Sequence, residues 1–151
     1  AVSNEQAENP DHVLRVNQLR SAAGFALGVA GGDKAIQRLV SMLDDAHPNT
    51  RFNAAMGLAR YGKLESKAVL LEMLDPESTA IISGEPEGSH AFKRSVVITN
   101  AIRAVVSLSE FHQAAELSDL IAAMRNLDAN ENVVNQTKLL AKDAVVKIRT
   151  K

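Results

Sequence analysis

Histidine and carboxylate side chains are the groups in this 151-residue chain that could act as acid–base catalysts or bind a metal. The chain has no cysteine, so thiolate nucleophiles, thiolate metal sites and disulfides are excluded. Four histidines (His12, His47, His90 and His112) fall in or near different predicted turns and helix ends. None forms the i, i+4 pair of a helical metal site. We therefore expect structural or surface histidines, and no metal or cofactor.

The remaining motifs do not predict an active site either. Asp44, Asp45 and Asp75 lie at predicted turns, where helix capping explains acidic residues. The glycine-containing segment from Gly84 to Gly88 is acidic and does not join a strand to a helix, so it does not resemble a phosphate-binding loop. No serine–histidine–aspartate grouping is recognisable from the sequence. We expect a protein that is not an enzyme.

Composition narrows the class of protein further. The 17 basic and 18 acidic residues nearly cancel, so no overall charge directs the chain to nucleic acid or to a membrane surface. The longest apolar run, residues 22–32, is shorter than the ~20 residues needed to cross a bilayer. The sequence predicts a soluble protein. Because the first residue is Ala1 rather than methionine, a processed exported protein and an excised domain are both open, and the compartment is unknown.

An internal repeat organises the chain. Residues 20–44 and 51–75 align at an offset of 31, with 8 of 25 positions identical, including Arg20/Arg51, Gly31/Gly62 and Asp44/Asp75. Two unrelated segments would share about two identities, so the match indicates a repeated structural unit. A third copy begins after an offset of 47, with Ala101 matching Ala54, which predicts an insertion of sixteen residues.

Apolar residues recur at helical spacing within each unit. We expect a flexible arm at residues 1–9 and helical hairpins at about 10–45, 47–75 and 92–127. An inserted loop at 77–92 and a closing helix at 132–149 complete the predicted domain of residues 10–151. In the first helix, the 3–4 spacing predicts one apolar face that comprises Val13, Val16, Leu19, Ala23, Ala26, Leu27 and Ala30. The 77–92 loop is acidic and rich in Gly and Pro, and it is either a tolerated insertion or a runner-up contact surface.

The repeated units resemble short HEAT-type repeats of the kind also found in phycobilisome lyase subunits. The resemblance rests on an Arg at the start of the first helix, an Ala-x3-Leu core, a closing Gly, and Leu-x2-Met-Leu-Asp at the end of the second helix. It covers about half of the chain and implies a right-handed α-α superhelix, an all-α solenoid. In this family the concave side, lined by second helices, usually holds another protein.

The resemblance therefore predicts a protein–protein interaction module or scaffold that uses its second-helix face. Helix phase places these residues on that face: Gln37, Arg38, Ser41, Val69, Glu72, Ser118 and Asp119. An accessory subunit or domain of an enzyme, as among lyase-type HEAT-repeat proteins, remains an alternative. Nucleic-acid binding is a further alternative. It would need the basic residues of the closing helix to continue as a stripe over the first two units, whose charge is mixed.

The closing helix carries a second predicted surface. Leu139 and Val146, seven residues apart, fall on the side opposite the predicted core face. The terminal unit of a repeat protein should present a polar outer face to water. We therefore hypothesise that Leu139 and Val146 contact a second copy, a further domain of a longer parent chain, or a partner.

Overall fold

The computed structural model describes residues 9–150, which form seven α-helices and no strand. The helices are α1 (Pro10–Ala30), α2 (Asp33–Ser41), α3 (Pro48–Arg60), α4 (Lys67–Leu74), α5 (His90–Leu108), α6 (Ser118–Asn126) and α7 (Asn135–Arg149). Short 3-10 turns at Leu64–Ser66, Glu87–Ser89 and Leu127–Ala129 precede α4, precede α5 and follow α6. The predicted all-α class is confirmed. The expected N-terminal arm falls almost entirely outside the described residues.

Local signals in the sequence explain where α1 begins and ends. The Asn9 side chain accepts a hydrogen bond of 3.0 Å from the backbone N–H of Asp11, and Pro10 occupies the first turn, where its missing N–H costs nothing. Gly31 follows Ala30 with a φ of 66°, a left-handed conformation that glycine adopts without strain. The start and the stop of α1 therefore depend on residues at or next to its ends.

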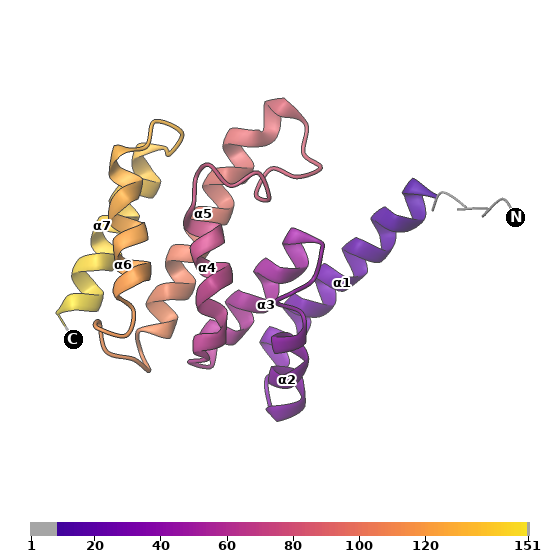
Figure 1. The fold of residues 1–151 in the computed structure, drawn as a ribbon, viewed down its shortest axis with the longest axis horizontal. Coiled ribbons are helices and arrows are strands. Elements are labelled where there is room, and N and C mark those ends of the chain that lie inside the picture. Colours follow the sequence, from indigo (N-terminus) through magenta and orange to yellow (C-terminus); the bar gives the residue numbers. More distant parts are fainter. Residues whose placement is uncertain (1–8, 151) are drawn as a thin grey trace, which may run out of the picture.

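The helices form two layers of a solenoid (Figure 1). The odd-numbered helices pack side by side in chain order, α1 on α3, α3 on α5 and α5 on α7. The even-numbered helices cover one side of this layer, with α2 on α1 and α3, α4 on α5, and α6 on α7. Each hairpin therefore buries its apolar face on its neighbours, as expected for an α-solenoid.

The buried apolar residues separate into two clusters. A small cluster of Leu39, Met42, Ala54 and Leu58 joins α2 to α3. The large cluster extends from α3 to α7 and includes fully buried Leu70, Ile98 and Leu120. The first hairpin is thus attached by a small core and by the close packing of α1 on α3, whereas the later helices share one continuous core.

The structure corrects much of the predicted inner face of α1. Gly24 and Gly28 are its buried positions, and Leu19, Ala23, Ala26 and Ala30 are exposed. Val13, Val16 and Leu27 are partly buried, and Leu27 packs against the small cluster. Apolar spacing could not distinguish the two sides of this helix, because apolar residues surround it and the side that faces α3 must be small. One apolar side of α1 is therefore not covered by any other described helix.

The sixteen-residue insertion lies against the core. Ile81, with 1% of its surface exposed, belongs to the large apolar cluster. The Arg94 guanidinium donates a 2.7 Å hydrogen bond to the Pro76 carbonyl, and the Lys93 ammonium lies 3.0 Å from a Glu85 carboxylate oxygen. Helix α5 begins at His90, inside the predicted loop. These contacts hold the segment in place on α5.

Candidate protein-binding groove

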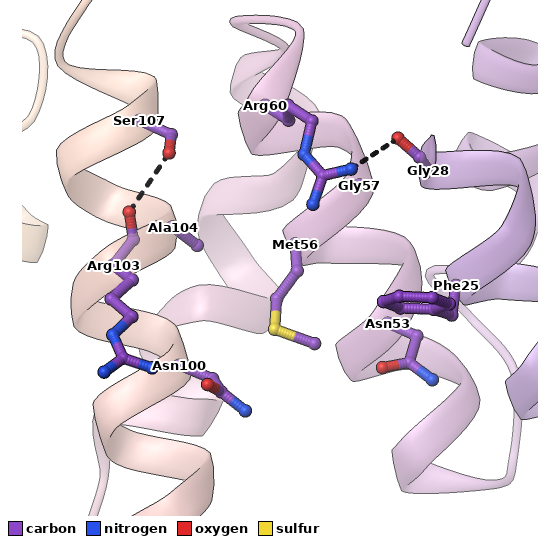
Figure 2. A pocket seen from close by; sticks show the side chains of 10 residues that line it. All are labelled: Phe25, Gly28, Asn53, Met56, Gly57, Arg60, Asn100, Arg103, Ala104 and Ser107. Atoms are coloured by element: carbon purple, nitrogen blue, oxygen red, sulfur yellow. Dashed lines mark hydrogen bonds between the residues drawn. The ribbon is translucent and has the colours of Figure 1, made fainter. Parts of the chain in front are cut away.

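A hollow of about 360 Å³ crosses the odd-numbered layer over α3, between α1 and α5. Figure 2 shows its lining, with Phe25 on α1 facing Asn53, Met56 and Arg60 on α3, and the α5 side chains opposite. The lining residues are Phe25, Gly28, Asn53, Met56, Gly57, Arg60, Asn100, Arg103, Ala104 and Ser107. The surface is thus hollowed on the first-helix side of the repeats.

The α3 and α5 walls of this hollow come from equivalent positions of the repeat. Asn53 and Asn100, Met56 and Arg103, and Arg60 and Ser107 are each 47 residues apart, the offset between the second and third units. Within each helix the three residues follow at i, i+3 and i+7, so they share one helix face. The groove is therefore a product of the repeat, with different side chains at each step.

Hydrogen bonds between helices fix part of the lining. The Asn53 amide donates to the Ser21 carbonyl at 2.9 Å and to its hydroxyl at 3.0 Å. The Arg60 guanidinium donates to the Gly28 carbonyl at 3.1 Å. Because these bonds join α3 to α1, they hold one end of the groove in a fixed shape.

A further hollow lies on the other side of α5, against α7. This second hollow, of about 480 Å³, lies between these helices and shares Asn100 and Arg103 with the first. Its far wall on α7 includes Leu139, Leu140 and Asp143. Arg103 therefore borders both hollows, which we together call the groove.

The first hollow is cationic and partly apolar. Arg60 and Arg103 contribute two guanidinium groups, and no carboxylate is among its lining residues. Phe25 and Met56 add apolar surface beside them. Guanidinium groups bind carboxylates by paired, charge-assisted hydrogen bonds, and aromatic and methionine side chains adapt to apolar ligands. This lining suits a segment that carries both a carboxylate and apolar side chains.

The residues predicted on the second-helix face are distributed along the even-numbered layer. Gln37, Arg38 and Ser41 are exposed on α2, where an Arg38 nitrogen donates to the Ser41 hydroxyl at 3.3 Å. Ser118 and Asp119 are exposed at the start of α6, and Asp119 pairs with Lys67 at 3.0 Å. Asp119 therefore ties α6 to the start of α4.

The two α4 residues that the sequence predicts on the second-helix face make contacts within the molecule. Val69 is 7% exposed and belongs to the large apolar cluster, so its prediction as a surface residue was wrong. Helix phase alone misplaced it, because α4 is covered by both α5 and α6. Glu72 forms an ion pair with Arg51, which engages both of its carboxylate oxygens. Its carboxylate is occupied within the second hairpin.

The two residues predicted as a surface of the closing helix are exposed. Leu139 and Val146 are each 62% exposed, and Leu139 lines the α7 wall of the groove. This places Leu139 on the same surface as Arg103.

Carboxylates with shifted pKa values lie at the connections between helices. Hydrogen bonds from the Asn130 and Asn132 side chains lower the pKa of Glu77, and the Gln113 backbone N–H lowers that of Glu116. A hydrogen bond from Lys142 lowers the pKa of Asp128. All three shifts have structural causes outside the groove.

Comparison with known proteins assigns the repeat. Residues 16–84 match the family model described as HEAT repeats. Over this segment, slightly less than half of the chain, the protein is similar to HEAT repeats. HEAT repeats generally mediate protein–protein interaction and are typically non-catalytic. No curated protein and no solved structure matches the chain significantly. In the part that the structure describes, no helix is long and apolar enough to cross a membrane.

The matched segment covers the first two HEAT units and ends inside the insertion, whereas the groove extends beyond it to α5 and α7. Sequence reasoning missed Asn53, Met56, Arg60, Asn100 and Arg103 as surface residues. A usable signal was present, because the 47-residue offset aligns these positions, and four of the five carry Asn or Arg where a core face would be apolar. The family resemblance predicts contacts on the second helices, so it does not indicate the first-helix side.

Proposed function

We propose that this HEAT-repeat protein is a non-catalytic protein–protein interaction module that binds a partner segment in the groove along α1, α3, α5 and α7. The observation that carries the proposal is the hollow over α3, where Arg60 and Arg103 border the apolar side chains of Phe25 and Met56. The bound segment would present a carboxylate to the arginines and an apolar side chain to Phe25 and Met56. The main contact surface is then the first-helix face, whereas the sequence predicts the second-helix face.

The availability of Arg103 supports this assignment. Its guanidinium has no hydrogen-bond or ion-pair partner among residues 9–150, and it borders both hollows. On the even-numbered layer, in contrast, Glu72 and Asp119 are engaged in ion pairs within the molecule. A charged group without an internal partner retains its full capacity to bind a ligand.

Affinity capture from native extract with matched charge reversals tests the proposal. Arg103→Glu reverses a groove cation, and Arg38→Glu makes the same change on an exposed position of α2. We expect the wild-type protein and Arg38→Glu to capture the same partner and Arg103→Glu to lose it. Circular dichroism of each variant checks that the helices remain folded.

Two results would contradict the proposal. If Arg38→Glu loses the partner and Arg103→Glu keeps it, the second-helix face binds instead. If nuclease treatment of the extract removes all captured material, the ligand is a nucleic acid. Once a partner segment is known, calorimetry with that segment should give at least a tenfold weaker affinity for Arg103→Glu, about 1.4 kcal/mol.

A further inference from the structure

One side of α1 is apolar and uncovered. Leu19, Ala22, Ala23, Ala26, Val29 and Ala30 are all exposed, and together they form what we call the α1 stripe. Leu19 alone leaves 70% of its surface exposed. At 100° per residue these six side chains lie within one face of the helix, opposite the buried Gly24 and Gly28. In Figure 1, α1 stands at the end of the layer, and its N-terminal half extends beyond the other helices.

The repeat shows what the same face does elsewhere in the molecule. With the offset of 31, Ala22, Ala26 and Val29 correspond to Asn53, Gly57 and Arg60 of α3. In α3 these positions receive α1, because Asn53 and Arg60 donate hydrogen bonds to α1 carbonyls and Gly57 touches Gly28. The α1 stripe is therefore, by position, a helix-receiving face.

The stripe differs from the α3 face in one decisive respect. It has no donor side chain at the positions of Asn53 and Arg60, nor at that of Tyr61, whose hydroxyl donates to the Val29 carbonyl at 3.4 Å. A further unit that packed as α1 packs on α3 would lose these hydrogen bonds. The wholly apolar stripe with alanines at its centre instead suits an identical stripe, since small side chains on both helices allow close approach.

Charges at the two ends of the stripe complement one another in an antiparallel pair. Arg15 lies one turn before Leu19 on the same side of α1, and Asp33 follows directly after the C-terminal end of the helix. Both side chains are exposed and have no ion-pair partner in the described part of the chain. When two copies of α1 cross antiparallel with Ala22 opposite Ala26, Leu19 faces Val29 and Arg15 faces Asp33.

We propose that the protein forms a two-fold symmetric dimer through antiparallel α1 stripes. Such an interface is isologous, so each contact occurs twice, including the Arg15–Asp33 pair. A net charge of −1 per chain leaves little repulsion between the copies. One helix face is smaller than the ~800 Å² per partner of a standard interface, so we expect a weak, reversible dimer.

Sedimentation equilibrium of the purified chain from about 1 µM to about 1 mM tests the dimer. The expected mass rises from the 16.2 kDa of one chain toward twice that value. Ala26→Arg places a charge at the centre of the stripe and should raise the dissociation constant more than about tenfold. Ala122→Arg makes the same change at an exposed alanine of α6 and should leave the dissociation constant unchanged.

Charge exchange tests the antiparallel register. Arg15→Glu should weaken the dimer, and adding Asp33→Arg should restore it. A chain that remains monomeric over the whole range, or a dimer that is indifferent to Ala26→Arg, would overturn the proposal. A double variant no stronger than Arg15→Glu would overturn the antiparallel pairing. The proposed groove is a separate surface, so Arg103→Glu should not change the mass, and either proposal can fail alone.

Discussion

Gly28 of α1 and Gly57 of α3 are in backbone contact. A Cβ atom on Gly28 would lie 2.8 Å from the Gly57 Cα, and a Cβ on Gly57 would lie 2.9 Å from the Gly28 Cα. Neither backbone can move aside without shifting a whole helix. This contact sets the distance between the first two units, and it forms part of the groove floor.

Gly28→Ala is therefore expected to destabilise the protein by about 1–3 kcal/mol through overpacking, despite the better helix propensity of alanine. Gly24→Ala is a matched control on the same helix, because its Cβ would meet the flexible end of the Met42 side chain at 3.1 Å. We expect a change within about 1 kcal/mol for Gly24→Ala, toward greater stability. Urea unfolding of both variants measures the difference, and equal effects would disprove the steric explanation.

The two repeat-equivalent arginines should differ in their contribution to stability. The Arg51 guanidinium binds both carboxylate oxygens of Glu72 and donates to the Asp45 carbonyl at 2.9 Å, with 17% of its side chain exposed. Arg51→Lys loses the paired geometry and should cost about 1.5–3 kcal/mol. Arg20, 44% exposed, lies 3.2 Å from an Asp45 carboxylate oxygen and donates to the Asn17 side chain at 2.7 Å. Because the Arg20 side chain is exposed in both contacts, Arg20→Lys should cost about 0–1 kcal/mol. Thermal unfolding that ranks Arg20→Lys as the more damaging change would contradict this reading.

The buried residue of the insertion should behave as a core residue. Ile81→Ala leaves a cavity in the large apolar cluster and should cost about 2–5 kcal/mol. Ile82 is only half-buried, so Ile82→Ala serves as the neighbouring control and should cost less. Chemical unfolding measures both values. Small and equal effects would show that the insertion is dispensable for stability.

His47 should make stability depend on pH. Burial lowers the pKa of the His47 imidazole below its ordinary value of 6.5, an effect that Asp45 partly opposes. Because the folded-state pKa is the lower one, the unfolded chain takes up this proton first as pH falls. The contribution is fully present above about pH 6.5 and is lost as pH falls through the folded-state pKa. Asn, a good N-cap residue, replaces His47 in the comparison variant.

We expect the free energy of unfolding to fall more steeply for the wild-type protein than for His47→Asn between about pH 7.5 and pH 5. Unfolding in urea at a series of pH values compares the two proteins. Parallel curves would show that His47 does not carry this pH dependence.

The sequence by itself determined the repeat, the class of fold and the ends of the first helix. The 31-residue offset, the Asn9–Pro10 start and the glycine at position 31 are local features, and each acts through backbone conformation or hydrogen bonds within a few residues. Such signals can be recognised from the sequence alone because the interacting residues are close in sequence. The HEAT resemblance follows from them.

Only the tertiary structure decided which faces are covered. Leu19 and Ala26 have the spacing of a core face yet are exposed, whereas Val69 has the phase of a surface residue yet is buried. Whether a helix face is buried depends on which helices pack against it. In α1, Gly28 determines which face is buried. Because it has no side chain, α3 packs on the glycine side, and the apolar side stays exposed.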